Sequence, residues 1–242
     1  MKKIIILFSA FVLLFITSCE IDNYEEPNAS VHGYFYDVKD GKTLVGTDII
    51  DGNSIGVYEQ GFKSESKQTW AIDNTGEYTN KRVFAATYRI EFLNTNFYPF
   101  DGEKMWTVKR GNNERDFLVT PFLRVNDANI VYDASSDKII AKCKIEAGGS
   151  DVTINQIRLF VFTDKWVGNR INSGIQGPSV LNLNGEQVDT NKEYTLIIDR
   201  AANKNFFQYS RNYYFRIGAQ AKGPSKYGTI RHNYSSLVVI KI

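Results

Sequence analysis

Apolar and polar residues alternate one by one over short stretches of this chain, and turn residues separate these stretches. The clearest examples are residues 31–37, 88–93 and 139–145. Because successive side chains of a β-strand point to opposite faces, this alternation predicts strands with one buried face. No window has the apolar spacing of a convincing amphipathic helix. The chain is therefore predicted to be all-β.

Turn residues divide the chain into two groups of predicted strands. In the first group, Asp73-Asn74-Thr75-Gly76 predicts a hairpin, since Asn and Gly tolerate positive φ. Pro121 marks the predicted boundary between the groups, and 242 residues, 43% of them hydrophobic, allow two domains of about 100–150 residues. The predicted strands are 31–37, 54–59, 68–72, 77–80, 88–93, 105–108 and 115–119, and then 128–132, 139–145, 154–163, 193–198, 212–221 and 234–242.

Each group is predicted to form one β-sandwich, the first over residues 30–120 and the second over residues 121–242. About six strands in ~120 residues suit an immunoglobulin-like sandwich for the second domain. Its segment 213–219 resembles the sixth strand of fibronectin type III domains. An antibody-type domain is excluded, because the sequence has no Cys–Trp–Cys spacing.

The first 18 residues have the pattern of a secretory signal. Lys2 and Lys3 precede an apolar run from Ile4 to Ile16, and a helix of that length rises about 20 Å, too short to cross a bilayer core. Residues 16–19, Ile-Thr-Ser-Cys, resemble a bacterial lipobox, which implies that Cys19 is the lipid-attachment residue. The alternative is a plain signal peptide or a short membrane anchor with an incidental cysteine.

Removal of this leader changes the charge of the chain. Lys and Arg fall from 29 to 29 − 2 = 27, equal to the 27 Asp and Glu, so the net charge falls from +2 to 0. A neutral mature chain has no electrostatic footprint for nucleic acid. Cys143 has no disulfide partner once Cys19 carries lipid, and its place in an alternating segment predicts a buried thiol.

Residues 19–29 are predicted to form a solvated acidic tether, because Glu20, Asp22, Glu25 and Glu26 cannot pack into a core. The run resembles the acidic signal that exports Bacteroidetes lipoproteins to the cell surface. This resemblance implies an outer-membrane protein that faces the cell exterior. An ordinary hydrophilic spacer on a lipoprotein that faces the periplasm is the alternative.

The sequence offers no catalytic or metal-binding constellation. Gly52-Asn53-Ser54-Ile55-Gly56 matches the letters of a nucleophile elbow, but a predicted strand follows it where that motif needs a helix. Two histidines 200 positions apart and one remaining cysteine give no zinc spacing. Counting does not exclude a pair of catalytic carboxylates, although two small sandwiches leave little depth for such a cleft. We expect no cofactor, no bound metal and no catalytic residues.

Aromatic residues remain as candidates for a binding site. Trp166, Asn169 and Arg170 lie in a long polar segment and are the first choice, since a ring stacks on the apolar face of a sugar while Asn and Arg bind its hydroxyls. Trp106 and nearby Tyr98 are the second choice. The alternatives are that Trp106 belongs to the core and that Trp166 plugs the end of a sandwich. Trp70 is predicted to be core.

Several short motifs resemble known families. Gly33-x-x-x-Asp37 with Asp40-Gly41, then 72–78 and 88–90, resemble the carboxypeptidase-regulatory, transthyretin-like sandwich, although residues 43–50 depart from that pattern. With the lipobox, residues 22–25 and the junction Thr120-Pro121-Phe122, the whole chain resembles the Bacteroidetes family of domain of unknown function 3823. This resemblance implies polysaccharide-utilisation loci, and as partners an outer-membrane transporter and its glycan-binding lid lipoprotein. It implies no catalytic residues.

Three functions follow as hypotheses. The first is a non-catalytic surface lipoprotein that binds glycan, or supports a glycan-uptake complex, without a cofactor. The second is a structural spacer or protein-interaction subunit that binds no glycan. The third is a hydrolase that acts on glycans.

Overall fold

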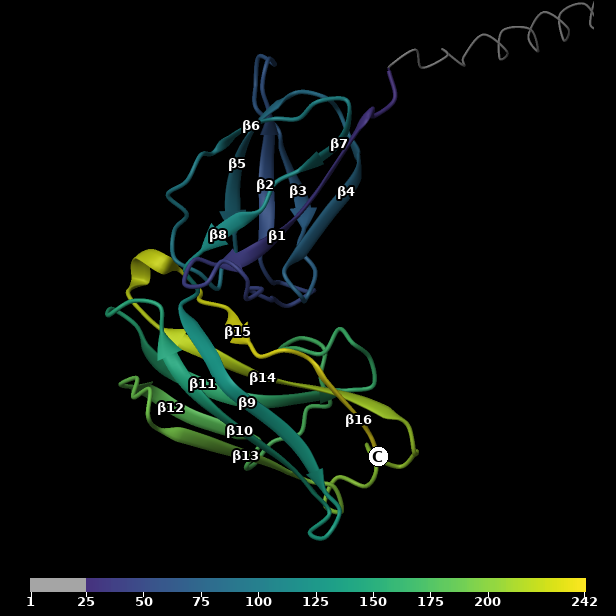
Figure 1. The fold of residues 1–242 in the computed structure, drawn as a ribbon, viewed down its shortest axis with the longest axis vertical. Helices are drawn as coiled ribbons and strands as arrows, with labels where there is room; N and C mark the ends of the chain where they lie inside the picture. Colours follow the sequence, from purple (N-terminus) through teal and green to yellow (C-terminus); the bar gives the residue numbers. More distant parts are fainter. Residues whose placement is uncertain (1–24) are drawn as a thin grey trace, which may run out of the picture.

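The computed structural model describes residues 25–242 and confirms the all-β fold class. Figure 1 shows two β-sandwiches placed end to end, with the chain entering the first sandwich at the end farther from the second. The predicted signal peptide, Cys19 and the first residues of the tether lie outside the described residues. Among the residues described, no helix is long and apolar enough to cross a membrane.

The N-terminal sandwich packs two four-stranded sheets face to face. In the first sheet β1 lies between β4 and β7, and β8 pairs in parallel with the second half of β1. The second sheet has the order β3-β2-β5-β6. The strands of this domain are β1 (Ala29–Asp37), β2 (Ser54–Glu59), β3 (Lys67–Ala71), β4 (Glu77–Val83), β5 (Thr87–Leu93), β6 (Met105–Thr107), β7 (Gly111–Glu114) and β8 (Phe117–Val119).

The alternating residues of β1 explain the core of this sandwich. Every second residue from Ala29 to Asp37 is buried, and Phe35 is fully enclosed at the centre. The rings of Tyr78, Phe92, Phe97 and Phe117 surround Phe35, with centroids 5.1–6.0 Å from its own. The aromatic residues of this half therefore form one packed cluster.

The C-terminal sandwich packs a three-stranded sheet, β13-β10-β9, on a five-stranded sheet, β12-β11-β14-β15, in which β16 also pairs with β14. This division of strands is that of a fibronectin-type immunoglobulin-like fold. A single 3-10 turn, η1 (Ser225–Tyr227), precedes β15. The strands are β9 (Leu123–Asp133), β10 (Lys138–Ala147), β11 (Thr153–Phe162), β12 (Val180–Glu186), β13 (Glu193–Asp199), β14 (Asn212–Lys222), β15 (His232–Tyr234) and β16 (Val238–Lys241).

Cys143 and Ile145 lie in the core of this sandwich, as predicted, and Tyr213 forms a contact that the sequence did not predict. Cys143 is 1% exposed on β10, and burial raises the pKa of its thiol to about 12, which makes it unreactive near neutral pH. Ile145 is fully buried on the same face. At the start of β14, the buried Tyr213 hydroxyl donates to the carbonyl oxygens of Tyr209 (2.9 Å) and Phe206 (3.3 Å). This contact is the tyrosine corner typical of immunoglobulin-like sandwiches.

The strand prediction differs from the structure in three places. The C-terminal half has eight strands instead of six. One of the two additional strands is the edge strand Val180–Glu186, whose Asn and Gly residues hide the alternation, and the other arises because the last predicted strand is divided in two. Residues 123–133 form one strand rather than starting at 128. Of the predicted strand 115–119 only β8 (Phe117–Val119) is strand, and β7 (Gly111–Glu114) precedes it. The predicted strand 234–242 is interrupted, and β15 begins before it at His232.

Candidate functional site

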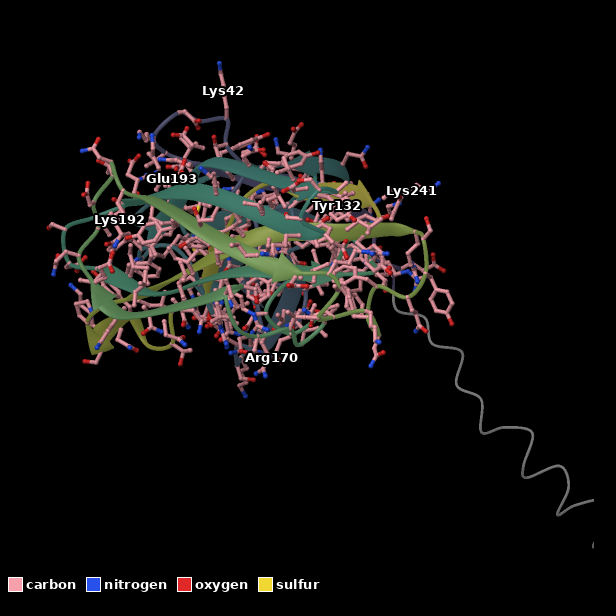
Figure 2. All side chains as sticks on the ribbon, turned by 90° about the horizontal axis from the view of Figure 1, so that it is seen from below. Lys42, Tyr132, Arg170, Lys192, Glu193 and Lys241 are labelled. Carbon is pink, nitrogen blue, oxygen red and sulfur yellow. The ribbon has the colours of Figure 1, made fainter. Side chains whose placement is uncertain are left out.

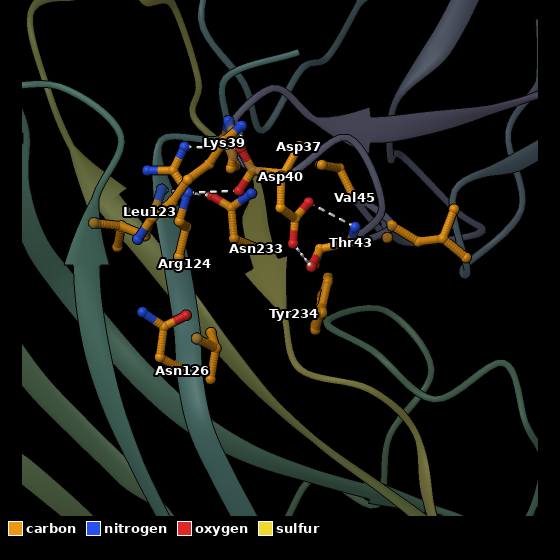
Figure 3. A pocket seen from close by; sticks show the side chains of 14 residues that line it. Asp37, Lys39, Asp40, Thr43, Val45, Leu123, Arg124, Asn126, Asn233 and Tyr234 are labelled. Carbon is orange, nitrogen blue, oxygen red and sulfur yellow. Dashed lines mark hydrogen bonds and ion pairs between the residues drawn. The ribbon is translucent and has the colours of Figure 1, made fainter. Parts of the chain in front are cut away.

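The two sandwiches meet through a buried ion pair at the end of β1. Both carboxylate oxygens of Asp37 accept hydrogen bonds from the Arg124 guanidinium on β9, at 2.5 and 2.8 Å. The two side chains are only 5% and 11% exposed. Glu146 accepts from Arg124 and from Lys39, which extends the pair into a four-residue network across the junction. Figure 3 shows the Asp37 and Arg124 side chains pointing toward each other.

A second charged contact lies deeper in the junction. Arg216, on β14 and only 3% exposed, donates to the carbonyl oxygens of Thr47 (2.6 Å) and Asn74 (3.0 Å) in the N-terminal domain. Its guanidinium stacks 3.4 Å from the centroid of the Tyr234 ring. Asp48 accepts from the Tyr234 hydroxyl and from the Asn169 backbone N–H, both at 2.7 Å. Burial raises the pKa of Asp48 against the influence of these partners.

A chain of buried amides completes the junction. Asn96 donates to the His232 carbonyl (2.8 Å) and accepts from the Asn53 side chain (2.7 Å). Asn233 donates to the Asn96 carbonyl and accepts from the Leu123 backbone N–H. Because buried amides lose free energy when their partners are lost, these bonds fix the relative position of the two domains.

His232 is a buried neutral base within this junction. Its side chain is 4% exposed, and burial together with the positive charges of Arg158, Arg216 and Arg231 lowers its pKa to about 3. Its ring packs against Phe160 and Tyr234. Between about pH 3 and pH 6.5, His232 is therefore neutral in the folded protein but protonated in the unfolded chain.

Acidification is expected to destabilise the protein through His232. An unfolded His takes up a proton near pH 6.5, whereas the folded one takes it up near pH 3, so the stabilisation is complete above pH 6.5 and is lost as the pH falls. Between pH 7 and pH 5 the loss is about 2 kcal/mol. Urea unfolding at pH 7, 6 and 5 measures it. The difference from His232→Gln isolates this group from Asp48, whose raised pKa gives a slope of opposite sign. Parallel curves for the wild type and His232→Gln would contradict the prediction, and His32→Gln, at a half-exposed position, is the control.

One cleft at the junction is polar and its charges are already paired. It has a volume of about 280 Å³ and lies between the 39–46 loop and β9 (Figure 3). Asp40 accepts from the backbone N–H groups of Lys42 and Thr43 and from the Thr43 hydroxyl, which lowers its pKa to about 2. Arg124 is occupied by Asp37. This cleft has few groups left to bind a ligand.

A second cleft of the same size is aromatic, and it is the candidate site. This aromatic cleft, of about 280 Å³, lies between β5, the 94–104 loop and η1, so that both domains contribute to it. Figure 1 shows η1 as the short yellow coil at the junction. A neighbouring cleft of about 360 Å³ shares Pro99 and Phe100 with it. The rings that line the aromatic cleft are Phe92, Phe97, Phe100, Phe122 and Tyr227.

Charged groups surround these rings. Glu91, Lys104 and Lys226 also line the cleft, together with Ile90, Thr95 and Pro99, and Lys104 and Lys226 are exposed. Asp151 holds the aromatic wall in place, because it accepts from the hydroxyls of Tyr98 (2.8 Å) and Tyr227 (2.7 Å). Those two bonds lower the pKa of Asp151. The cleft thus combines apolar ring surfaces with hydrogen-bonding groups at its edge.

The structure does not bring the five predicted binding residues together. Tyr98 lines the neighbouring cleft and supports Tyr227 through Asp151. Trp106 is corrected to a core residue: it is 9% exposed and packs edge-on against Trp70 and Tyr78, because alternation on β6 points it inward. It therefore has no free ring face for a ligand. Trp70, at 4% exposed, is core as predicted.

Trp166, Asn169 and Arg170 lie together on the loop between β11 and β12, which contacts the N-terminal domain. Trp166 is half-buried beneath the Lys165 ammonium, 4.5 Å from its ring centroid. The Asn169 backbone binds Asp48, and Arg170 forms an exposed ion pair with Asp51 at 2.7 Å. In Figure 2 Arg170 projects at the edge opposite Lys42. This loop joins the domains, and its three predicted residues line none of the clefts described above.

Sequence reasoning missed Tyr227 and Lys104. Tyr227 follows Gly223-Pro224 in a turn, where a tyrosine gives no pattern, and only the domain arrangement places it opposite Phe100. The cluster of aromatic residues at 97–100 was the available signal.

Ser54 begins β2, with no helix after it, so the Gly-x-Ser-x-Gly letters form no nucleophile elbow. Within residues 25–242, no group of three or more His, Cys, Asp or Glu side chains is placed to hold a metal ion.

Fold and site define a two-domain β-sandwich protein with an aromatic cleft at its domain junction. Residues 31–120 match the family model "Protein of unknown function (DUF3823) N-terminal domain", and residues 123–238 match "Domain of unknown function (DUF3823_C)". The chain belongs to the DUF3823 family.

Solved structures agree with this assignment. A "putative carbohydrate binding protein" from Bacteroides uniformis ATCC 8492 is 43% identical, with a TM-score of 0.83 over 89% of this chain and 100% of that one. DUF3823 family proteins from Parabacteroides merdae ATCC 43184 (16% identity, TM-score 0.72, 90% and 100% covered) and Bacteroides uniformis ATCC 8492 (21%, 0.70, 89% and 100%) share the fold. No curated protein matches the chain.

Proposed function

We propose that this protein captures glycans, without catalysis, in the aromatic cleft between its two domains. The observation that carries the proposal is the cleft itself, in which partly exposed Phe92, Phe100 and Tyr227 lie beside the side chains of Lys104 and Lys226. A similar protein, 43% identical over its whole length, is described as a "putative carbohydrate binding protein", which supports the same class of ligand.

The chemistry of the cleft suits a sugar. A pyranose ring has an apolar face of C–H groups that stacks on an aromatic ring, while its hydroxyls donate to carboxylates and accept from ammonium groups. Lys104 forms no ion pair with another described residue and is available to a hydroxyl or a carboxylate of the ligand. The Asp151 bond to Tyr227 holds that ring in position before a ligand arrives, which lowers the entropy lost on binding.

Binding rather than hydrolysis fits the carboxylates of this cleft. Hydrolysis of a glycosidic bond generally needs two carboxyl groups, one on each side of the bond. Glu91 is the single carboxylate among the residues that line the aromatic cleft, and it already accepts from the Tyr58 hydroxyl at 2.7 Å. We therefore assign the cleft no catalytic step and no cofactor.

We further propose that Cys19 carries a lipid and that the acidic tether presents both sandwiches on the outer face of the outer membrane. There the protein would serve a polysaccharide-uptake complex with a transporter and its lid lipoprotein. The leader, the lipobox-like residues 16–19 and the acidic run support this placement. If globomycin leaves the precursor size unchanged and Cys19→Ala still fractionates with membranes, the anchor is wrong.

Affinity electrophoresis of the unlipidated mature chain against a panel of polysaccharides tests the glycan proposal. We expect at least one polymer to retard the wild type, and Tyr227→Ala and Phe100→Ala to weaken the apparent affinity at least tenfold. Tyr209→Ala and Phe62→Ala are matched controls, because their rings are 65% and 69% exposed outside the clefts, and they should retain full retardation. Circular dichroism confirms that each variant is folded.

The other outcomes separate the alternatives. Retardation by no polymer would favour a spacer or protein-interaction subunit. Loss of retardation in Trp166→Ala, with Tyr227→Ala unaffected, would move the site to the loop between β11 and β12. Release of reducing sugar by the wild type would establish a hydrolase instead.

A further inference from the structure

The end of the N-terminal sandwich farthest from the C-terminal domain is where the chain enters the fold (Figure 1). Ala29, the first residue of β1, pairs with Val83 at the end of β4 and with Gly111 at the start of β7. The β2–β3 connection lies at the same end, since Glu59 pairs with Tyr88 at the start of β5. We name this end the entry pole and define it as residues 60–66, 81–86 and 108–110.

The length of the preceding chain keeps the entry pole close to the proposed anchor. Five residues lie between Cys19 and Glu25, the first described residue, and the six residue-to-residue steps of a fully extended chain span at most about 22 Å. Glu25 lies beside the pole, because its carboxylate pairs with Arg110 at 3.2 Å. A lipid on Cys19 therefore holds the pole within about two nanometres of the bilayer surface.

The surface chemistry of the entry pole fits an anionic lipid surface. Two phenylalanines protrude there: Phe62 is 69% exposed and Phe84 is 40% exposed. Around them are four exposed basic side chains that form no ion pair with any described residue, namely Lys63, Lys81, Arg82 and Lys109.

Among the described residues, the acids near the pole only partly offset this positive charge; Glu20 and Asp22 of the tether lie outside those residues. Glu65 is bound by Arg89, and Glu25 is bound by Arg110, while Glu26 and Glu59 remain without a cationic partner among the described residues. Phenylalanine is among the apolar residues that peripheral proteins bury at the boundary of headgroups and acyl chains, and each basic residue near an anionic surface adds to the attraction. The exposed Phe62 and its basic neighbours therefore form a surface of apolar and cationic groups that lipid headgroups can cover.

We propose that the entry pole docks on the lipid surface, with Phe62 at the level of the headgroups and the basic side chains on lipid phosphates. This inference rests on the lipid anchor of the proposed function. It fixes the orientation of the protein: β1 rises from the pole to Asp37 at the junction, and nine strand residues span about 30 Å. The aromatic cleft then faces its ligand about 30 Å above the membrane rather than at its surface.

Site-directed labelling of the lipidated protein tests this orientation. Ser64→Cys, beside Phe62, and Ser210→Cys, on an exposed loop of the C-terminal domain, are matched positions. The buried native thiol of Cys143 does not compete for the label. Each variant carries the same fluorophore in vesicles of phosphatidylethanolamine and phosphatidylglycerol (3:1) that contain a headgroup-attached nitroxide quencher. We expect at least threefold stronger quenching at position 64 than at position 210.

A double variant and a change of vesicle composition make the result specific to the pole. Phe62→Ser with Lys63→Ser should reduce quenching at position 64 at least twofold, and so should vesicles without phosphatidylglycerol. Equal quenching at positions 64 and 210, or quenching at 64 that ignores both changes, would overturn the proposal. Because the label reports orientation only, this result is independent of whether the aromatic cleft binds glycan.

Discussion

Replacement of Arg216 by methionine is expected to lower the free energy of unfolding by about 3–5 kcal/mol. The guanidinium is buried, and its loss removes the side-chain donor of the Thr47 carbonyl and the shorter of two hydrogen bonds to the Asn74 carbonyl. It also leaves Asp48 in the junction without the nearby positive charge that favours its ionised form. Methionine fills much of the volume but supplies no donor, so the unpaired groups are what the experiment measures.

Urea unfolding followed by circular dichroism gives this difference from the midpoint and slope. Arg170→Met is the matched control, because Arg170 also joins the two domains but through an ion pair whose side chains are 56% and 48% exposed. Exposed pairs contribute about 0–1 kcal/mol, so this variant should differ little from the wild type. Equal losses in the two variants would show that burial of Arg216 has no special role in the junction.

The consequence for function follows from the position of the cleft. The aromatic cleft is built from both domains, so loss of the junction should also weaken glycan retardation by Arg216→Met. A fixed junction holds Phe100 and Tyr227 at a constant separation, which spares the ligand the entropy of ordering them.

The second large effect is expected for Phe35→Ala, which should lose about 3–5 kcal/mol of unfolding free energy. Phe35 is fully buried, and four aromatic rings contact it from both sheets. Removal of the ring leaves a cavity that these neighbours cannot all fill, since each is held by contacts of its own.

Phe62→Ala is the matched control for Phe35→Ala in soluble protein, since the same change at a 69% exposed ring should alter stability by no more than about 0.5 kcal/mol. Thermal and urea unfolding should agree on the difference. A loss below about 1 kcal/mol for Phe35→Ala would mean that the N-terminal core can repack and that its aromatic cluster is not a rigid unit.

The strands were predictable because their signal is local. In residues 31–37 and 139–145 apolar residues alternate because every second side chain faces a core. Both segments are strands with that burial pattern. Val180–Glu186 escaped prediction because an edge strand buries little and so leaves a weak pattern. The burial of Trp70 and Cys143 was predicted for the same local reason.

The candidate site was not predictable in the same way. Trp106 and Trp166 both have polar neighbours in the sequence, as a sugar-stacking ring would. In the structure, however, Trp106 points inward from β6, and Trp166 lies on the loop after β11 that contacts the N-terminal domain. Tyr227 and Phe100 are 127 positions apart in the chain, and no local pattern in either segment predicts that they line the same cleft.

The amino-acid sequence alone determined that this protein is all-β, which residues alternate into its two cores, and that its beginning has the pattern of a lipoprotein leader. Only the tertiary structure decided how the sandwiches meet, and with that the aromatic cleft, the neutral His232 and the exposed entry pole. The physical reason is range: strand periodicity is set by neighbours a few residues apart, whereas a cleft between domains depends on buried contacts such as Asp37–Arg124 and Arg216–Thr47, whose partners are far apart in the chain.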